Sequence, residues 1–572
     1  MRELRAGPLT LLLDERDIRR VRWREVELVR RLGVAVRDPG WRTVPARGGE
    51  AEVVRDDVDG LAIRVAAHHA DETLDVRWEG LIEAGADGRL SYAITWRAEH
   101  DAGYNRIGLV ALLPPRTVVG RPCATVGPAG EERITLPEDI VPQPWAEGRF
   151  HAMLPPFSSL AAELPEGTLT CTFTGDLFEI EDQRNWADDS FKVYGTPLAR
   201  PLPQHARAGA PVEQGVHVAF APNAATGSPV RAPAHAREDE PVTVRIGGET
   251  GRTVPPLGLI AAGAAPAPEV VAALRRVGPA HLRHDVHPGR AGWGEPLRAA
   301  VGACAALGCG LELAVHTGDP ADLAAVCDAA RDAPLIRLLV FGTSRDPSDP
   351  ACCTPPALAA AARRLLDGGV PLTGGTDLSY ADLNRWRPDT AALDEVTYTV
   401  SAQVHERDDL TVVENVEGMA ATVASARHAF APLPIAVGRV ALREGEPDAR
   451  LPTSFGAAWA LAAVAGIVGA GAASVTTFAA HDALPSPLAD ALAAYGQLQG
   501  APLLAVDAVP TPVAVLAART PDGPTALLAN PGDEDVVLSV SASGDGAVAV
   551  RLAARSWRRL APADLRPSTP TA

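Results

Sequence analysis

The hydrophobic pattern of the chain changes near residue 256. Beyond that point, almost continuously apolar runs alternate with alanine-rich stretches of helical character, such as APEVVAALRRV. Eight apolar runs lie at residues 257–263, 281–287, 311–317, 335–343, 371–377, 395–405, 434–442 and 473–482. Parallel strands covered by helices have this near-continuous apolar character. We therefore predict an α/β domain over residues 251–503, a central (β/α)8 TIM barrel, with a doubly wound open sheet as the alternative.

The chain before Pro203 has a different period. Segments such as LSYAITWRA and TLTCTFTGDLFEIED alternate apolar and polar residues and are separated by Gly, Pro and Asp. This period of two predicts an antiparallel β-sandwich, which together with a linker and two further strands fills residues 1–250. Short apolar runs return after residue 503, in VVLSVSAS and AVAVRLAA, and predict a small C-terminal β-domain at residues 504–572.

One long uncharged run, residues 451–480, has to be assigned either to the protein core or to a membrane. Its length is sufficient for a membrane span, but it consists mostly of Ala and Gly, with Pro, Ser and Thr toward its ends. We predict a buried helix followed by a buried strand.

Composition narrows the classes of partner and compartment. The formal net charge of −18 and the lack of clustered basic residues argue against binding to nucleic acid or to an anionic membrane. Seven cysteines without paired CxxC spacing indicate neither a disulfide framework nor a thiolate metal site. The N-terminal apolar run is too short for a signal peptide. We expect a cytoplasmic protein that binds a small molecule. No sequence feature decides the oligomeric state.

The predicted strand ends are rich in histidine and aspartate. Active sites of such barrels lie at the carboxyl ends of the strands. The side chains there are His284, Asp285, His287, His316, Asp377, His405, His481 and Asp482. The alternative for Asp285 and Asp377 is that each caps the following helix. The segment ADLNRWRP, just beyond the fifth run, adds Asn384, Arg385 and Trp386 as donors and as a platform for a sugar ring, or as a capped helix start with the tryptophan packed on the barrel.

The residues of this rim could also belong to a metal site or to a glycosidase site. Histidines with an aspartate suit Zn or Mn, but the HxH arrangement of metal-dependent hydrolases belongs on the first strand, which here reads LGLIAAG. We predict no metal and no cofactor. A retaining glycosidase needs two carboxylates across the sugar, and barrel glycosidases take them from strands four and seven. Neither predicted strand ends in a glutamate here.

The segment EIEDQRNWADDSFK, residues 179–192, is unusually polar and follows a long predicted strand. It contains Lys192, the single lysine among 53 basic residues. A compact ammonium is not interchangeable with a guanidinium in a tight site, so this lysine indicates either a substrate-binding role or an ion pair with Asp188 or Asp189. We predict that the segment contributes to the site or to a domain interface through Glu181, Asp182, Arg184, Asn185, Trp186 and Lys192.

Five segments together carry a resemblance to a known family. They are VRDPGW at 36–41, YNRIGL at 104–109, FEIEDQRNWADDSFKVYGTPLARP at 178–201, ADLNRWRP at 381–388 and SAQVHERDD at 401–409. In this order they resemble the D-apionate lactonase family. The resemblance implies a bacterial enzyme of apiose catabolism that hydrolyses the lactone of D-apionate and has a glycosidase-like barrel. It also implies a small-molecule sugar lactone as the partner. Glycoside hydrolysis and non-catalytic carbohydrate binding are the alternatives.

Lactone hydrolysis requires a base, an oxyanion donor and an acid for the leaving alkoxide. We expect His405 to act as base or acid, oriented by Asp285 or Asp377, with Glu181 as a further catalytic carboxylate. Arg385 or Lys192 would face the oxyanion. The substrate hydroxyls would then contact a set of polar and aromatic side chains, which are Asp182, Arg184, Asn185, Trp186, His287, His316 and Asn384.

Overall fold

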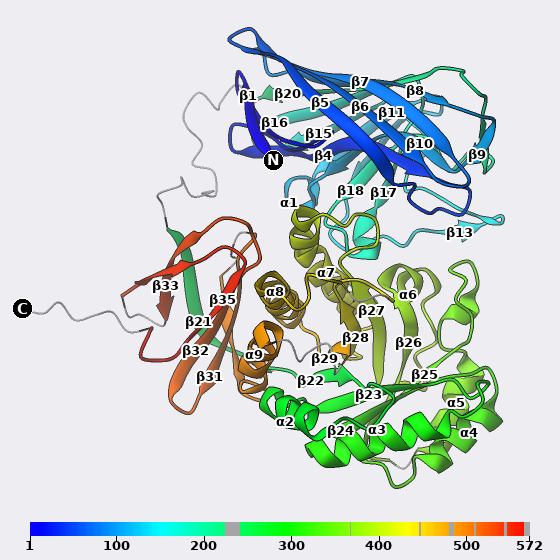
Figure 1. Cartoon of the computed structure of the whole chain (residues 1–572), viewed down its shortest axis with the longest axis vertical. Helices are drawn as coiled ribbons and strands as arrows, with labels where there is room; N and C mark the ends of the chain where they lie inside the picture. The colour runs from blue at the N-terminus through cyan, green and yellow to red at the C-terminus, as the bar shows by residue number, and fades with distance from the viewer. Residues whose placement is uncertain are drawn as a thin grey trace, which may run out of the picture. The chain divides into compact units, whose positions relative to one another are not determined.

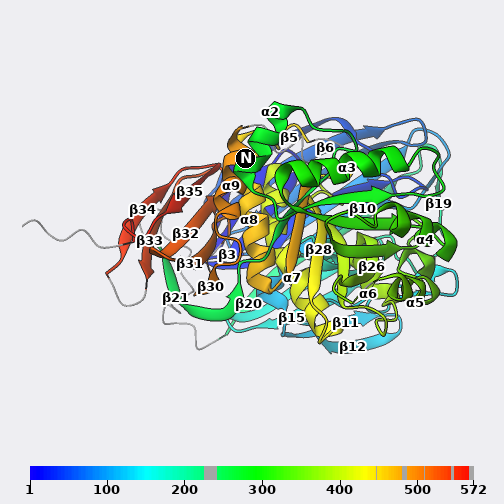
Figure 2. The ribbon, with the colours of Figure 1, turned by 90° about the horizontal axis from the view of Figure 1, so that it is seen from below.

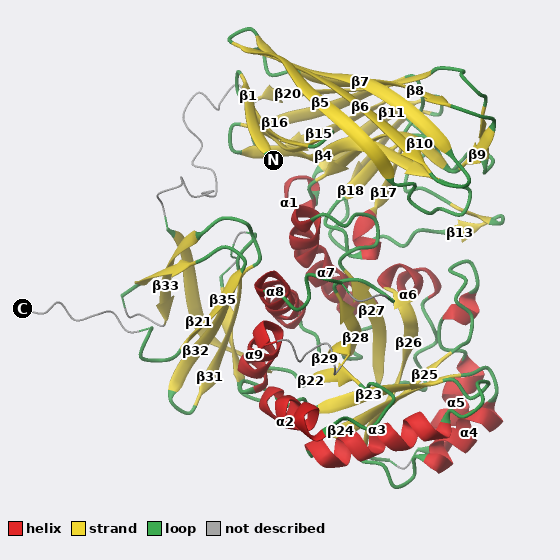
Figure 3. Ribbon diagram, viewed as in Figure 1, coloured by secondary structure: helices red, strands yellow, loops and turns green. Residues whose placement is uncertain are grey.

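The computed structural model describes residues 1–223, 241–366, 368–445, 448–479, 486–507, 509, 511–542 and 546–565. Contacts divide them into two units. The N-terminal unit holds residues 1–183 and 189–223, and the barrel unit holds residues 184–188 together with the described residues from 241 onward. Strands dominate the first unit, and helices surround the barrel strands of the second (Figure 3).

The N-terminal unit is built on two antiparallel sheets (Figure 1). The first has the order β1 (Arg2–Ala6), β2 (Leu9–Asp14), β3 (Asp17–Trp23), β4 (Val26–Arg37), β10 (Arg106–Leu113), β18 (Phe191–Tyr194) and β17 (Glu179–Asp182). The second has the order β12 (Gly130–Thr135), β11 (Pro122–Gly127), β15 (Ser159–Leu164), β16 (Gly167–Thr174), β20 (Val212–Pro222), β8 (Leu90–Ala98), β7 (Asp75–Gly85), β6 (Gly60–Ala70) and β5 (Ala46–Asp57).

One hydrophobic core joins these sheets. Ile18 and Leu32 of the first sheet and Ile63 and Tyr92 of the second belong to the same buried cluster. Period-two alternation places one face of each sheet inside, and the predicted sandwich is confirmed. Four short strands and one helical turn complete the unit: β9 (Ala102–Tyr104), β13 (Trp145–Ala146), β14 (Arg149–Phe150), β19 (Gln204–Ala206) and α1 (Pro115–Val118).

Eight parallel strands close into a barrel in the second unit, which confirms the predicted TIM barrel and removes the open-sheet alternative. They are β22 (Leu257–Ile260), β23 (His281–Val286), β24 (Gly310–His316), β25 (Leu335–Phe341), β26 (Leu372–Ser379), β27 (Glu395–Ser401), β28 (Ile435–Ala441) and β29 (Ser474–Ala479). The helices of this unit are α2 (Pro268–Val277), α3 (Gly294–Leu307), α4 (Pro320–Ala329), α5 (Pro356–Leu365), α6 (Tyr380–Trp386), α7 (Asp409–Ala429), α8 (Ser454–Ala470) and α9 (Ser486–Gly496).

The uncharged run at residues 451–480 forms the buried helix α8 and then the buried strand β29, as predicted. Helix α8 lies beside α7 (Figure 1, Figure 2). Its Ala and Gly residues allow close packing, and its buried residues include Trp459 and Ile467. Among the described helices, none has the length and apolar character that crossing a membrane requires.

The C-terminal β-domain is a sheet that also takes a strand from before the barrel. Its order is β34 (Val548–Leu552), β33 (Val536–Ala542), β21 (Val242–Thr253), β30 (Pro502–Val506), β31 (Ala514–Thr520), β32 (Gly523–Asn530) and β35 (Ser556–Leu560). The sequence had assigned residues up to 250 to the N-terminal domain, whereas β21 pairs with β33 and β30. Strand pairing between residues so distant in sequence leaves no local signal in the pattern.

Polar side chains fill the barrel interior near the amino ends of the strands. Arg337 donates to Glu312 Oε2 at 2.7 Å and to both oxygens of Glu395. His281 Nε2 lies 2.9 Å from Thr476 Oγ1 and 3.5 Å from Glu312. The charges are paired inside the buried interior, which a barrel of this kind fills with side chains.

Candidate active site at the carboxyl ends of the barrel strands

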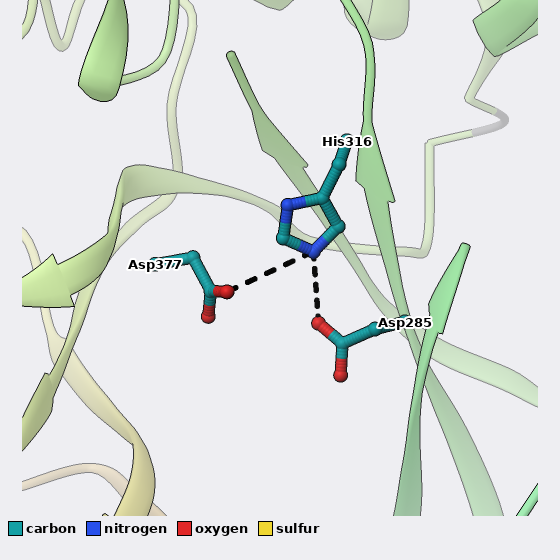
Figure 4. Close-up of side chains that lie close together, drawn as sticks. All are labelled: Asp285, His316 and Asp377. Atoms are coloured by element: carbon teal, nitrogen blue, oxygen red, sulfur yellow. Dashed lines mark hydrogen bonds and ion pairs between the residues drawn. The ribbon is translucent and has the colours of Figure 1, made fainter. Parts of the chain in front are cut away.

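Three predicted side chains meet at the carboxyl ends of β23, β24 and β26. His316 Nε2 lies 2.9 Å from Asp285 Oδ1 and 3.9 Å from Asp377 Oδ2, so the imidazole faces both carboxylates (Figure 4). Neither aspartate caps a helix, since the residues before α3 and α6 are Trp293 and Ser379. The strands therefore direct these groups into the barrel mouth.

Two arginines that sequence reasoning missed hold this cluster together. Arg283, fully buried, donates to Asp285 Oδ1 at 2.7 Å and to Asp377 Oδ1 at 2.6 Å. A side chain at Gly438 would force Arg283 to shift, because an added Cβ would lie 2.5 Å from Arg283 Nη1. Arg439 donates hydrogen bonds to the carboxylate and to the main-chain carbonyl of Asp377.

The arginines set the charge state of the aspartates. Burial by itself would raise the pKa of Asp285, but the charge of Arg283, hydrogen bonds from His316 and Arg283, and the charge of Arg439 together hold it well below its usual range. Asp285 is therefore an anion throughout the neutral range.

The two histidines of the sequence HDVH, His284 and His287, have different surroundings. The ring of His287 stacks on that of His316 with centroids 4.3 Å apart. Burial, His316 and Arg290 lower the pKa of His287, so it is neutral at neutral pH. His284 is buried, and burial lowers its pKa although Asp285 opposes this. His481 and Asp482, also predicted at the mouth, lie outside the described residues.

A cavity of about 270 Å³ opens beside the cluster. It is lined by residues from the ends of β22, β27, β28 and β29 and from the segment after β28, among them Ser401, Arg439, Asp448 and Phe478. Asp448 accepts hydrogen bonds from Gln403 and Arg450, and these bonds hold its pKa far below the usual range although burial opposes them. The mouth thus combines a small, largely apolar cavity with charged groups that are fixed by their neighbours.

His405 lies in the segment after β27, but its carboxylate partner differs from the two that the sequence suggested. His405 Nδ1 bonds to Asp188 Oδ2, and Asn415 of α7 donates to Asp188 Oδ1 at 2.8 Å. Asn415 also donates to the carbonyl of Ala402 at 2.9 Å. The ring of Trp186 meets that of His405 edge-on, with centroids 5.7 Å apart. The described contacts of Asp285 and Asp377 do not include His405.

The polar segment at residues 179–192 divides between the two units. Residues 184–188 belong to the barrel unit. There Trp186 and Asp188 contact His405. Asn185 Oδ1 accepts a hydrogen bond from Asn384 Nδ2 at 3.2 Å. Gly418 of α7 makes this approach possible, since an added Cβ would lie 2.2 Å from the carbonyl oxygen of Ala187. The family-specific segment therefore contributes directly to the carboxyl end of the barrel unit.

The flanks of this segment belong to the N-terminal unit. Lys192 Nζ lies 3.6 Å from Glu181 Oε1, and both side chains are buried. The sequence had offered Asp188 or Asp189 as the partner of the lysine, whereas Asp188 holds His405 and Asp189 accepts from Arg30. Asp182 accepts from the backbone of Val141 at 3.4 Å. Arg184, which lies within residues 184–188, is also buried.

Helix α6 carries the other predicted binding residues. Arg385 donates to Asp382 at 3.0 Å and to the carbonyl of Pro347 at 3.1 Å, and Trp386 donates to the same carbonyl. These contacts attach α6 to the segment after β25. Asn384 also accepts from Arg387 at 3.1 Å. The described contacts thus give Arg385 a structural role and leave its predicted oxyanion role without geometric support.

Asp285, His316 and Asp377 also have the composition of a metal site, because their ligand atoms all lie within 4.8 Å of one another. However, Arg283 binds both carboxylates, Arg439 binds Asp377, and Arg345 lies 3.5 Å from Asp377. A divalent cation at this position would be close to three guanidinium groups, so the donor set does not suit one.

Comparison with known families matches most of the chain. A model of the D-apionate lactonase N-terminal domain matches residues 1–223, and a model of the D-apionate lactonase TIM barrel domain matches residues 256–445. The chain belongs to the D-apionate lactonase family. The residues matched by the two lactonase domain models include the site residues Asp188, Asp285, His316, Asp377, His405 and Arg439. The resemblance predicted from five sequence segments is confirmed.

A curated relative and solved structures extend the comparison. The D-apionate lactonase of Brucella anthropi is 26% identical over 455 residues, which cover 76% of this chain and 72% of the relative. A GH30 endoxylanase from Clostridium papyrosolvens is 12% identical with a TM-score of 0.41, covering 56% of this lactonase family member and 99% of the xylanase. A beta-arabinopyranosidase is 11% identical with a TM-score of 0.34, covering 97% and 99% of the two chains.

Proposed function

We propose that the protein is a carboxylic-ester hydrolase that opens a sugar-acid lactone, with D-apionolactone converted to D-apionate in carbohydrate catabolism. Membership of the D-apionate lactonase family supports the substrate class. The observation that carries the proposal is the cluster of Asp285, His316 and Asp377 with Arg439 beside a cavity at the carboxyl ends of the strands. A reducing cytoplasm suits the seven cysteines, all of which are free thiols.

The reaction consumes one water molecule. The water oxygen adds to the lactone carbonyl carbon while a base takes one of its protons, and the carbonyl oxygen becomes an oxyanion. The ring carbon–oxygen bond then breaks, and the departing ring oxygen receives a proton. The product is a hydroxy acid, which releases a proton at neutral pH and is then a carboxylate. Hydrolysis is therefore accompanied by acidification, which can be measured directly.

His405 is our candidate for the base. Asp188 accepts the Nδ1 hydrogen of His405, which fixes the tautomer whose basic lone pair is on Nε2. Asn415 holds the other oxygen of Asp188 and so fixes the carboxylate in turn. Trp186 packs edge-on against the imidazole and limits its rotation. This combination of carboxylate, imidazole and packed ring matches the arrangement that orients a general base.

The other groups of the mouth would bind the substrate. We assign Asn384 and Asn185, which bond to each other, to the sugar hydroxyls, because an amide pair offers both donors and acceptors. His316 and His287, stacked beside Asp285 and Asp377, would face the lactone ring. Asp285 is held as an anion by Arg283 and would act by hydrogen bonding rather than as a proton donor.

The test is hydrolysis by the purified full chain in a weakly buffered solution. D-Apionolactone and a panel of other aldonolactones are followed by acid release, and nitrophenyl glycosides by chromophore release. We expect acid release with lactones, fastest with D-apionolactone, and unchanged rates after treatment with a chelator. His405→Ala should lower kcat at least about a hundredfold. The matched control, His205→Ala, removes an exposed histidine of the N-terminal unit and should retain the parental rate.

Each departure from this result has a specific meaning. Chromophore release without acid release would replace lactone hydrolysis by glycoside hydrolysis. Ligand binding without turnover of any compound would identify a carbohydrate-binding relative. An unchanged kcat in His405→Ala, with lactone hydrolysis intact, would remove His405 from the mechanism while leaving the reaction class in place.

A further inference from the structure

Arg439 occupies a break in the regularity of strand β28. The pairing register with β27 and with β29 shifts between Val437 and Val440, so the residues between them form a bulge. Arg439 itself has φ of 49°, a left-handed conformation that is unfavourable for a residue with a side chain. Bulges of this kind redirect side chains beside active sites. The backbone of β28 is thus deformed at the residue that points into the mouth.

Among the described residues, only one nitrogen of the Arg439 guanidinium has a hydrogen-bond partner. Nη2 donates to the carboxylate and to the carbonyl of Asp377. In the described part of the chain, Nε and Nη1 have no hydrogen-bond partner, the side chain keeps 27% of its exposure, and it lines the cavity of about 270 Å³. Asp377 therefore fixes one edge of the group, and the remaining donors are available to whatever enters the cavity.

The hydrogen-bond donors at this position suit an anion. Two carboxylates, Asp285 and Asp377, are already shared among Arg283, Arg439 and Arg345. Arg345 also lies 3.5 Å from Glu444, and Glu444 and Asp448 line the same cavity, so the donor atoms of Arg439, and not a surplus of positive charge, are what suits an anion. A guanidinium held rigidly beside a small cavity is suited to a carboxylate or an oxyanion.

We propose that Arg439 binds the negatively charged oxygen that appears at the lactone carbonyl, first as the oxyanion and then as the carboxylate of the aldonate product. The assignment rests on the proposed lactone hydrolysis for the identity of the anion. Because the lactone is neutral and the product is an anion, the same contact makes the product a ligand of the resting protein. The cavity is thus an aldonate site in which Arg439 recognises the charge.

The test separates charge recognition from recognition of the hydroxyl groups. Sodium D-apionate and the neutral alditol D-apiitol are titrated calorimetrically into the full chain and into Arg439→Gln, Arg439→Lys and Arg364→Gln. Arg364→Gln is the matched control, because Arg364 is exposed on the outer helix α5. We expect D-apionate to bind the parent more tightly than D-apiitol. Arg439→Gln should weaken D-apionate binding about tenfold or more, with D-apiitol unchanged. Arg439→Lys should recover part of the affinity.

Kinetics on the same proteins give an independent measure. D-Apionate should inhibit lactone hydrolysis competitively in the parent, and Arg439→Gln should both lower kcat and raise the inhibition constant. If Arg439→Gln and Arg439→Lys both have the melting temperature of the parent, unfolding is excluded as the cause. Parental affinity for D-apionate in Arg439→Gln, or equal binding of D-apiitol and D-apionate by the parent, would overturn the assignment.

The proposed reaction and this assignment can fail separately. If the parent hydrolyses no lactone but binds D-apionate through Arg439, the reaction is wrong and the anion site stands. If it hydrolyses lactones and Arg439→Gln keeps its product inhibition, the anion site is wrong and the reaction stands. Titration with zinc or manganese chloride provides the last arm: saturable metal binding that Asp377→Asn abolishes would overturn the anion site in favour of a cation site.

Discussion

At the scale of single residues, the identity of a side chain and the identity of its partner carry different information. His405 is recognisable in the sequence because it follows an apolar run and because imidazole is a common acid–base group in enzymes. Its carboxylate, Asp188, lies 217 residues away and sits in a segment that the sequence showed only as unusually polar. The partner decides which imidazole nitrogen carries the proton, and so it decides whether the histidine can act as a base.

The contact between Asp188 and His405 leads to a prediction about turnover. Asp188→Asn keeps the shape of the side chain but removes the acceptor that fixes the tautomer. We expect kcat for lactone hydrolysis to fall at least about tenfold with KM little changed. Asp188→Glu should restore part of kcat. Steady-state kinetics measure both constants, and Asp328→Asn at an exposed ion pair on α4 is the control. A parental kcat in Asp188→Asn would show that the carboxylate does not orient the base.

A second residue-scale prediction concerns stability in acid. Burial raises the pKa of Glu27 but Arg30 and Arg116 oppose it, and the pKa is lowered from 4.5 to about 2. A depressed folded pKa stabilises the fold above the unfolded pKa, by about 3 kcal/mol, and this is lost as pH falls toward 2. Relative to Glu27→Gln, the extra stability of the parent should fall by roughly half between pH 6 and pH 3. Denaturant unfolding at both pH values measures it, and a constant difference would contradict the assignment.

At the scale of elements, irregular positions in otherwise regular strands and helices give the site its shape. The bulge in β28 turns Arg439 toward the cavity, and Gly438 beside it leaves room for Arg283. Helix α7 does the same for residues 184–188, since Gly418 lets the backbone at Ala187 approach. The two elements thus each contribute a glycine, and the absence of a side chain there leaves room for a neighbouring group of the site.

Gly418 supplies the element-scale prediction. The methyl group of Gly418→Ala would lie 2.2 Å from the carbonyl oxygen of Ala187, so the segment that carries Trp186 and Asp188 has to move. We expect kcat for lactone hydrolysis to fall at least about tenfold and the free energy of unfolding to fall by about 1–3 kcal/mol. The control, Gly302→Ala, places the same methyl group on α3 in open space and should be neutral or stabilising. Parental activity in Gly418→Ala would show that this approach is unimportant.

At the scale of the whole molecule, the barrel holds two layers of arginines that differ in how their charges are satisfied. Near the amino ends of the strands, Arg337 is enclosed by Glu312, Glu395 and Ser474. Near the carboxyl ends, Arg439 keeps part of its exposure and lines a cavity. The first arrangement satisfies its charges internally, as a structural layer should, and the second leaves donors for a ligand.

A substitution in the amino-end layer should lower the stability of the protein without changing its activity. Arg337→Met leaves the buried Glu312 and the partly buried Glu395 without their cation, and we expect the free energy of unfolding to fall by about 3–5 kcal/mol. At a temperature where the variant remains folded, its KM and kcat should stay close to the parental values. Denaturant unfolding and steady-state kinetics provide the two readings, with Arg364→Met on the exposed face of α5 as the control. A large loss of kcat in the folded variant would show that the amino-end layer acts on the site.

Much of the fold could be predicted because its signals are local. Continuously apolar runs marked all eight barrel strands, and period-two alternation marked the sandwich. The run from 451 to 480 gave α8 and β29 through its composition alone. The placement of β21 in the C-terminal sheet could not be predicted, because a strand's own pattern does not state which other strand it pairs with.

The sequence by itself placed Asp285, His316 and Asp377 at the barrel mouth, since the end of a strand fixes their location without any knowledge of their contacts. It also determined the family, through short segments whose order is independent of packing. Only the tertiary structure decided the hydrogen-bonded pairs, which are His405 with Asp188 and Arg439 with Asp377. Only the tertiary structure placed Arg283 beside Asp285 and Asp377. The physical reason is that hydrogen bonds and charge act over a few ångströms in space, and chain closure brings together residues that sequence separates by hundreds.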